Sequence, residues 1–397
     1  MDKVFVVPGN AGTDAIAENI PIAITDLEAI GALAQDQQIQ LTIVGPEAPL
    51  SLGIVDHFQS RGLPIFGPTK SATLIESSKV FAKQLMEKHH IPCAKGRVFD
   101  SYEEAIAYTN SHPLPFVVKA NGLAAGKGVV IAQSREEAQS AICNIMKHRV
   151  FGAAGDTVLI DECLKGKEVS LIAITDGKSV IPMVPACDYK RVFDEDRGPN
   201  TGGMGSYSPP SFFGEKEMNT AMQTILEPTV AAMAKEGVPY KGILYAGLML
   251  TQDGMKVLEF NARFGDPETQ VILPRLKNDL MELLLRVTQG NLANVKVEWT
   301  DKACVGVIMT SGGYPGQYQT GYPIEGLERL PEDILVFHAG TKRTPPGIIQ
   351  TDGGRVLTMV GTGATLAEAS TNVYSSITQV HFDNCHYRTD IAARETA

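Results

Sequence analysis

The chain has 397 residues, more than a single hydrophobic core usually organises, so we expect two or three domains. Hydrophobic residues make up 44% and charged residues 20%, which is typical of soluble globular proteins. A formal net charge of −10 argues against a dedicated nucleic-acid-binding protein. The six cysteines form no CxxC pair, and neither a long apolar run nor an N-terminal signal pattern is present. We therefore expect a cytoplasmic protein without nucleic-acid or membrane partners.

Residues 1–76 alternate short apolar runs with stretches of helical character. The runs Val4–Val7, Leu41–Val44 and Pro64–Phe66 are each followed by a turn containing glycine and proline. Apolar strands of this kind predict a parallel α/β domain over residues 1–76. Such sheets bind ligands at the carboxyl ends of their strands, so the turns are candidate substrate loops.

Residues 77–298 combine a helix, two hairpins and a long polar stretch. We expect a helix over Phe81–His89 and strands over Phe116–Lys119, Val129–Ala132, Thr157–Asp161, Glu168–Ile174, Leu244–Leu250 and Lys256–Phe260. Residues 188–210 are polar, rich in glycine and proline, and without clear periodicity, so they are expected to form a long functional loop. The pattern resets near residue 298. A strand at Ala303–Thr310 and a helix at Leu366–Ile377 predict a small α+β domain over residues 299–397.

The strongest chemical signal is the segment Leu258–Glu268. Side chains alternate along a strand, so Glu259 and Asn261 point to the same face. Two oxygen ligands on one face suit Mg²⁺, which keeps water and phosphate as its other ligands. Arg263 continues this face and could bind a phosphate or a carboxylate. The alternative is an ordinary strand with an exposed charged face.

A glycine-rich loop at residues 120–128 connects two of the expected strands. Its glycines let backbone N–H groups approach phosphate oxygens, and Lys119 and Lys127 could add positive charge. The loop lacks both the dinucleotide fingerprint and the Gly-Lys-Ser/Thr of a P-loop. An ordinary flexible hairpin is about as compatible with the pattern.

Two further segments carry clustered charges. Asp161 and Glu162 end a strand and Glu168 begins the next, so backbone and carboxylate could hold an adenine and a ribose; the alternative is solvated surface acids. Residues 188–191, followed by a glycine-rich stretch at 198–205, suggest contact with an anionic substrate or with ATP phosphates. The alternative is a solvated run of charges.

Taken in order, these segments resemble the ATP-grasp superfamily and, within it, the phosphoribosylamine–glycine ligase family. The resemblance covers almost the whole chain and is most specific at residues 198–205 and 258–268. It implies an N-terminal parallel α/β domain (1–76), an ATP-grasp domain (77–298) with a small lid at about 97–160, and a C-terminal α+β domain (299–397).

The resemblance also implies roles for individual residues. ATP would be held by Lys79, Lys119, Gly122, Gly126, Lys127, Gly128, Glu162, Leu164 and Glu168. The metal ligands would be Glu259 and Asn261, and Arg263, Lys190 and Asp188 would be catalytic. The ligated substrates would contact Gly9, Asn10, Gly12, Glu47, Thr201, Gly202, Gly203, Met204, Asp266, Pro267 and Glu268.

The implied reaction joins glycine to 5-phosphoribosylamine through glycyl phosphate, with ATP and Mg²⁺ (or Mn²⁺), in a monomer or weak homo-oligomer. The alternatives are another ATP-grasp carboxylate–amine ligase and an ATP-binding protein without turnover. In the family, a strand and a Gly-Gly-Arg-Glu-His turn precede the Pro8–Thr13 motif, whereas here only residues 1–7 do. From this difference we expect weak binding of phosphoribosylamine.

Overall fold

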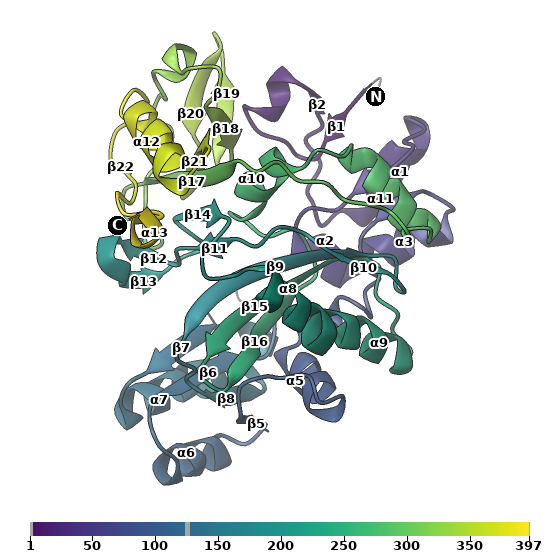
Figure 1. Ribbon diagram of the computed structural model, residues 1–397, viewed down its shortest axis with the longest axis vertical. Coiled ribbons are helices and arrows are strands. Elements are labelled where there is room, and N and C mark those ends of the chain that lie inside the picture. Colours follow the sequence, from purple (N-terminus) through teal and green to yellow (C-terminus); the bar gives the residue numbers. More distant parts are fainter. Residues whose placement is uncertain (1–2, 124–127, 397) are drawn as a thin grey trace.

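The computed structural model describes residues 3–123 and 128–396 (Figure 1). In the N-terminal part, β1 (Phe5–Val6) pairs in parallel with β2 (Glu18–Asn19), and β3 (Thr42–Ile43) pairs in parallel with β4 (Ile65–Phe66). The expected parallel pairing is confirmed, although the strands form two separate two-stranded ladders. The apolar faces of α1 (Leu27–Asp36), α2 (Glu47–Leu52) and α3 (Ile54–Ser60) pack beside these strands around the buried Phe58.

The middle of the chain contains two four-stranded antiparallel sheets. The smaller sheet has the order β5 (Gly96–Phe99), β8 (Val158–Glu162), β6 (Phe116–Ala120) and β7 (Val129–Ala132), and α6 (Tyr102–Ser111) and α7 (Arg135–Ile142) pack against it. The larger has the order β10 (Val180–Pro182), β9 (Lys167–Thr175), β15 (Gly242–Thr251) and β16 (Gly254–Asn261). The register Lys119↔Val129 confirms the expected hairpin around the glycine-rich loop.

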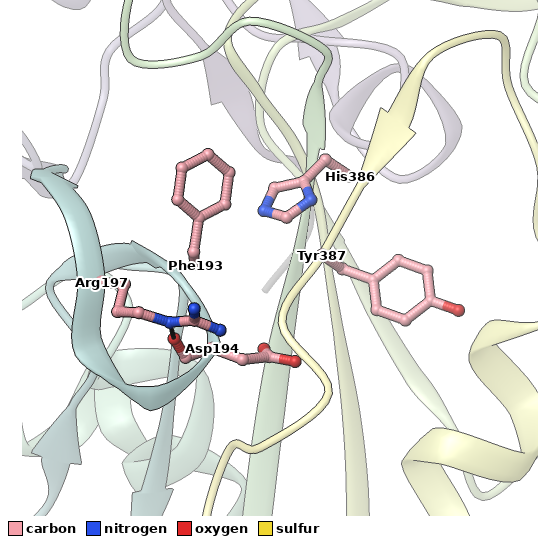
Figure 2. Close-up of a pocket in the computed structure, with 5 residues that line it drawn as sticks. All are labelled: Phe193, Asp194, Arg197, His386 and Tyr387. Atoms are coloured by element: carbon pink, nitrogen blue, oxygen red, sulfur yellow. Dashed lines mark hydrogen bonds between the residues drawn. The ribbon is translucent and has the colours of Figure 1, made fainter.

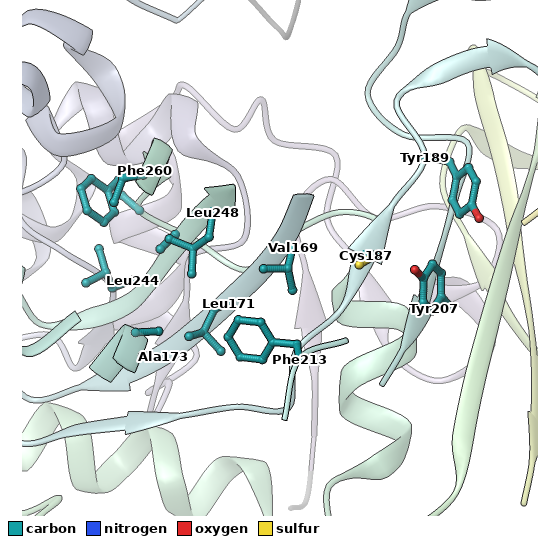
Figure 3. Packing of buried hydrophobic residues seen from close by; sticks show 14 of the residues in the cluster. Val169, Leu171, Ala173, Cys187, Tyr189, Tyr207, Phe213, Leu244, Leu248 and Phe260 are labelled. Carbon is teal, nitrogen blue, oxygen red and sulfur yellow. The ribbon is translucent and has the colours of Figure 1, made fainter. Parts of the chain in front are cut away.

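Apolar side chains on one face of the larger sheet form much of the main core. Val169, Leu171 and Ala173 alternate along β9 and are fully buried, as are Leu244 and Leu248 on β15 (Figure 3). Helices cover this core: α5 (Lys79–Lys88), α8 (Glu215–Ala221) and α9 (Glu227–Lys235). Helix α5 begins where the Ser78 side chain accepts a hydrogen bond from the Phe81 N–H, which fixes the position of the first helical residue, Lys79.

The C-terminal part is built on a six-stranded sheet. Its main order is β11 (Cys187–Asp188), β14 (Gly205–Ser208), β17 (Ala303–Ser311), β21 (Arg355–Gly363) and β18 (Leu335–His338), and β22 (Cys385–His386) also pairs with β17. Helix α12 (Leu366–Ile377) packs on β21 and ends at the expected residues. The remaining α-helices and strands are α4 (Leu74–Ser77), α10 (Thr269–Ile272), α11 (Leu280–Gln289), the hairpin β19 (Thr341–Thr344)–β20 (Ile348–Thr351), and α13 (Ala393–Thr396).

The expectation of a long irregular loop at residues 188–210 was wrong. This segment contributes β11 and β14 to the C-terminal sheet, and between them it forms the hairpin β12 (Arg191–Phe193)–β13 (Arg197–Asn200). Strands of two to four residues are too short to produce a periodic pattern in the sequence. Within residues 3–123 and 128–396, no helix combines the length and apolar character needed to cross a bilayer.

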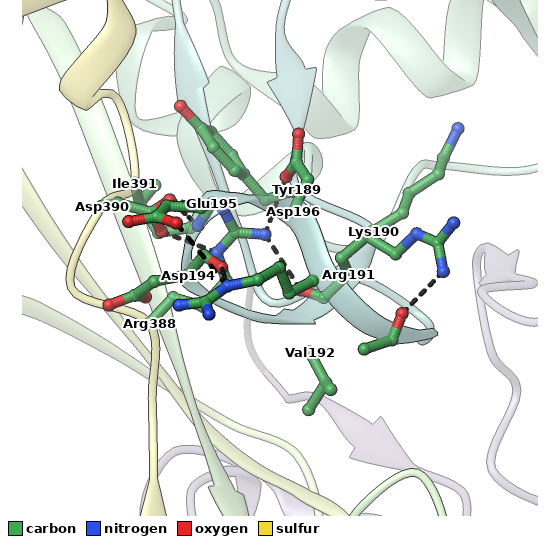
Figure 4. A network of polar contacts seen from close by, with 12 residues as sticks. Tyr189, Lys190, Arg191, Val192, Asp194, Glu195, Asp196, Arg388, Asp390 and Ile391 are labelled. Carbon is green, nitrogen blue, oxygen red and sulfur yellow. Dashed lines mark hydrogen bonds and ion pairs between the residues drawn. The ribbon is translucent and has the colours of Figure 1, made fainter.

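A buried arginine joins the β12–β13 hairpin to the C-terminal segment. The Arg388 side chain is fully buried, forms ion pairs with Asp196 (2.9 Å) and Asp390 (2.7 Å), and donates to the Arg191 carbonyl (3.0 Å; Figure 4). Its guanidinium also lies over the Tyr189 ring, 4.6 Å from the centroid. The hairpin leads directly to residues 201–205, so this contact holds one end of a candidate substrate loop.

We expect Arg388→Ala to lower the free energy of unfolding by roughly 3 kcal/mol, because it removes a buried guanidinium that packs on Tyr189, leaves Asp390 without its cation and leaves Asp196 with only the exposed Arg394. Urea unfolding followed by circular dichroism measures this change. The matched control is Arg329→Ala, which removes an exposed arginine paired with Glu328 and should change stability by less than about 0.5 kcal/mol. Equal effects of the two substitutions would contradict the stabilising role of the buried Arg388.

Candidate active site

Three of the expected ATP and metal residues lie together where the two middle sheets meet. Lys79 begins α5, Lys119 lies on β6, and Glu259 lies near the end of β16. Lys119 Nζ donates to the Leu258 carbonyl (3.1 Å), which ties the smaller sheet to the strand that carries Glu259. Burial alone would raise the pKa of Glu259, but Lys190, Lys79, Lys119 and Arg263 lower it below its ordinary value. Glu259 is therefore an ionised carboxylate surrounded by cations.

Lys79 differs from the other cations of this cluster. Burial lowers its pKa below the ordinary value, Lys119 acts in the same direction, and Glu259 opposes both. Among the described residues, no carboxylate lies within ion-pair distance of Lys79, whereas Lys119 has one such partner and Lys190 and Arg263 each have two. The cluster thus contains an ammonium group without a direct counter-ion.

The glycine-rich loop starts beside Lys79. The Asn121 side chain accepts hydrogen bonds from Ser78 Oγ (3.1 Å) and from the Val80 N–H (3.2 Å), which fixes the loop to the beginning of α5. Gly122 has a φ of +145°, and a Cβ there would lie 2.7 Å from the Cβ of Ala154. At the other end, the Gly128 carbonyl accepts from the Ala120 N–H (2.8 Å). Gly126 and Lys127 lie outside the described residues.

The expected adenine and ribose residues follow β8. Glu162 accepts from the Lys95 N–H (2.8 Å) and pairs with Lys256 (3.2 Å), and the partly buried Leu164 follows in the connection to β9. Glu168 is the second residue of β9 and is in direct contact with Lys190. The structure therefore places Glu168 at the cation cluster and Glu162 on its β8 side.

A second group of acids lies next to Lys190. Asp188 Oδ1 is 3.9 Å from Lys190 Nζ, and the buried Glu268 accepts from Ser170 Oγ (2.8 Å) and Tyr245 OH (2.9 Å). Burial raises the pKa of Asp188 to about 8; Lys190 opposes this rise, and Glu268 contributes to it. Lys190 stays charged, because Asp188 and Glu168 outweigh the effect of its burial on its pKa.

Arg263 joins the N-terminal part to the cluster. Its guanidinium pairs with Glu47 (3.1 Å) and Glu76 (3.5 Å), and Glu76 also accepts from the Ala262 N–H (2.7 Å). Burial raises the pKa of Glu76 from 4.5 to about 7, and Arg263 opposes this rise. Of the N-terminal residues expected at the site, Glu47 is brought to the cluster in this way.

The expected substrate residues at 201–204 and 266–268 lie against each other. A Cβ on Gly203 would be 2.5 Å from Pro267 Cδ, and Ser206 Oγ donates to the Pro267 carbonyl (2.8 Å). Thr201 Oγ1 donates to the Lys190 carbonyl (2.9 Å), which connects this loop to the acids described above. The Met204 side chain is fully buried, so only its backbone is available to a ligand.

The loop containing Gly9, Asn10 and Gly12 is not joined to the cation cluster by any described contact. Asn10 Nδ2 donates to the His338 carbonyl (2.8 Å), and its Oδ1 accepts from the N–H groups of Gly12 (2.9 Å) and Thr13 (3.0 Å). The side-chain amide therefore fixes this loop to the C-terminal part.

The residues present fit a divalent metal that shares its ligands with phosphates. The β-bulge between β15 and β16 lies before Glu259, so Glu259 and Asn261 remain on one face of the strand. Within the described part of the chain, no three His, Cys, Asp or Glu side chains cluster as a metal site. A carboxylate and an amide alone suit Mg²⁺, which is bound through few protein ligands.

A surface pocket lies away from this cluster. It is lined by Phe193, Asp194, Arg197, His386 and Tyr387, between the β12–β13 hairpin and the C-terminal segment (Figure 2). None of the residues expected to bind ATP, metal or substrate lines it.

The sequence reasoning missed several polar residues at the site. Arg355 donates to the Gly202 carbonyl (2.6 Å) and to Asp266 (2.5 Å), and Tyr314 OH accepts from the Gly202 N–H (3.0 Å). The sequence also allowed Asp161 to be a solvated surface acid. In the structure it is buried between Lys83 and Lys119. Glu76 could not be recognised from the sequence, because a carboxylate on a short helix carries no local signal of burial.

Three sequence patterns of one family match the chain. "Phosphoribosylglycinamide synthetase, N domain" matches residues 1–76, the ATP-grasp (A) domain of the same synthetase matches residues 77–269, and its C domain matches residues 304–394. A protein of Caldanaerobacter subterraneus subsp. tengcongensis named phosphoribosylamine–glycine ligase is 49% identical over 393 residues, covering 99% of this chain and 94% of that protein. A Halalkalibacterium halodurans protein of the same name is 49% identical over 397 residues, covering 100% and 92%.

Solved structures confirm the expected fold class. The crystal structure of phosphoribosylamine–glycine ligase from Thermotoga maritima has a TM-score of 0.86 and 34% identity, covering 98% of this chain and 94% of that one. The biotin carboxylase domain of Hydrogenobacter thermophilus 2-oxoglutarate carboxylase, in complex with MgADP, ADP and bicarbonate, has a TM-score of 0.75 at 15% identity, covering 97% and 86%. This second likeness concerns the fold alone.

The raised pKa of Glu76 predicts a pH-dependent stability. Between pH 4.5 and about 7 the folded protein retains a proton that the unfolded chain loses, so this contribution is full below pH 4.5 and is lost as the pH rises to about 7. Relative to Glu76→Gln, the wild type should lose up to about 3 kcal/mol of unfolding free energy over this range. Urea unfolding at several pH values in metal-free buffer measures the difference. The exposed control Glu332→Gln should follow the wild type, and a constant difference between the wild type and Glu76→Gln would contradict the prediction.

Proposed function

We propose a function from one premise: the chain belongs to the phosphoribosylglycinamide synthetase family. It is an ATP-dependent carbon–nitrogen ligase of purine biosynthesis that joins glycine to 5-phosphoribosylamine. ATP is converted to ADP and phosphate, and the product is glycinamide ribonucleotide.

One observation supports the position of ATP more than any other. Lys79 is partly buried, has no carboxylate partner among the described residues, and lies in the same cluster as Lys119 and Glu259. Desolvating an unpaired ammonium group is unfavourable, so this position favours an anionic ligand. We therefore place the triphosphate between Lys79, Lys119 and the Glu259 strand, under the loop that contains Gly122 and Gly128. The adenine and ribose would lie toward Glu162, Leu164 and Glu168.

The first step must bring a carboxylate to a polyanion. The glycine carboxylate attacks the γ-phosphorus, forming glycyl phosphate and releasing ADP. Lys79, Lys119 and Arg263 neutralise the negative charge that accumulates, so their contribution is positioning and electrostatic stabilisation. Glu259 and Asn261 would hold Mg²⁺, or Mn²⁺, and the metal would supply further positive charge at this point.

In the second step the amine of phosphoribosylamine attacks the glycyl carbonyl carbon and phosphate leaves. The amine must lose a proton as the amide forms. The Asp188 carboxylate, whose pKa is raised to about 8, is suited to accept this proton and becomes a neutral acid when it does so; before the transfer, Lys190 beside it balances the charge of the carboxylate. The two substrates would be positioned by the two loops beside Lys190, through Thr201, Gly202, Gly203, the Met204 backbone, Asp266, Pro267 and Glu268.

We propose that Glu47 reaches the substrates through Arg263, and that the loop of Gly9, Asn10 and Gly12 contributes from the N-terminal side. The net charge of −10 supports an enzyme that works without a nucleic-acid partner. We propose a monomer or weak homo-oligomer as the working form.

The direct test is release of ADP by the purified full chain with Mg²⁺, ATP, glycine and freshly prepared phosphoribosylamine. We expect ADP and glycinamide ribonucleotide to form in equal amounts, and omission of either substrate to abolish ADP release above background. The matched control replaces glycine with other small amino acids. Turnover that does not depend on glycine, or that needs a different amine, would replace this proposal with another ligase of the same fold.

A further inference from the structure

A buried group of three charges lies beneath the expected phosphate site. The Asp161 carboxylate on β8 is 3.1 Å from Lys83 Nζ through Oδ1 and 3.0 Å from Lys119 Nζ through Oδ2. The side chains are 4%, 3% and 11% exposed for Asp161, Lys83 and Lys119, so water contributes little to their solvation. One carboxylate is thus shared by two lysines. Of these two, Lys119 is expected to bind phosphate and Lys83 is not.

The surrounding chain makes room for this arrangement. Gly96 on β5 is the register partner of Asp161, and a Cβ at that position would lie 2.0 Å from Asp161 Oδ1. Lys83 is held from the other side, because its ammonium group also donates to the Ala94 carbonyl. Burial opposes the charge on Lys83, but Asp161, together with Cys93 and the exposed Glu87 at 3.6 Å, outweighs it and raises the pKa of the lysine. Lys83 is therefore a fixed, charged partner of Asp161.

Because Lys83 shares the carboxylate, Lys119 can leave Asp161 without leaving it unpaired. If Lys119 were the sole counter-ion of Asp161, moving its ammonium group to a phosphate would leave a buried carboxylate unpaired. Such a carboxylate is strongly unfavourable, so Lys119 would be held in place and would bind phosphate poorly. With Lys83 present, Asp161 keeps a counter-ion when Lys119 turns to the nucleotide.

We propose that Lys83 is a positioning residue, which retains Asp161 so that Lys119 is released to bind the ATP phosphates. This inference rests on the proposed function, in which Lys119 contacts the triphosphate. Lys83 itself does not touch the nucleotide. The alternative is a buried ion pair that stabilises the fold without affecting nucleotide binding.

A double-mutant cycle separates these two roles. In Lys83→Met the lone Lys119 stays bound to Asp161, so we expect the Kd and KM for MgATP to rise at least about tenfold, while kcat at saturating ATP and the KM for glycine change less than about threefold. Adding Asp161→Asn removes the carboxylate that retains Lys119. The double variant should therefore return to within about threefold of the wild-type Kd. If Lys83→Met does not fold, Lys83→Gln replaces it in the cycle, because glutamine keeps a donor for the Ala94 carbonyl. The same rise in the Kd for MgATP is expected.

The control is Lys88→Met on the same helix, which removes an exposed lysine paired with Glu236 and should leave the Kd for MgATP unchanged. Two results would overturn the inference: a lower melting temperature of both Lys83 variants with a wild-type Kd, or a double variant that binds MgATP no better than Lys83→Met. Wild-type protein that lacks ATP binding or glycine-dependent ADP release would instead contradict the proposed function.

Discussion

The site depends on four cations that surround the Glu259 carboxylate. Glu259 lies among Lys79, Lys119, Lys190 and Arg263, and these cations keep it ionised although burial opposes its charge. Three of these cations each lie within ion-pair distance of at least one carboxylate, whereas Lys79 has no such partner among the described residues. A metal-bound polyanion would supply the counter-charge that Lys79 lacks.

The surrounding elements hold this cluster from three parts of the chain. The Ser78 cap sets the start of α5, Asn121 ties the glycine-rich loop to that start, and Glu76 fixes Arg263 at the end of β16. The C-terminal sheet incorporates β11 and β14, so the loops at 188–191 and 201–205 belong to both the site and the C-terminal core. Arg388 then secures the hairpin between them. The substrate side is therefore held more by tertiary contacts than by any one local motif.

The sequence predicted what has a local signature. The alternation along β16 placed Glu259 and Asn261 on one face, and the strands around the glycine-rich loop indicated a hairpin. The sequence could not predict contacts whose cause is remote. Asp161 reads locally as a surface acid, and only the approach of Lys83 from α5 and Lys119 from β6 makes it a buried one. The sequence did not predict the short strands β11 to β14 for a related reason: pairing with their neighbours, rather than their own pattern, makes them strands.

The central claim is that Lys79 is the unmatched charge that the nucleotide neutralises. Isothermal titration of MgATP into the wild type, Lys79→Met and the exposed control Lys88→Met tests it most directly. Loss of one charged hydrogen bond of about 2–3 kcal/mol predicts that Lys79→Met binds roughly 30- to 150-fold more weakly, while Lys88→Met binds like the wild type. Wild-type affinity in a folded Lys79→Met protein would contradict the account.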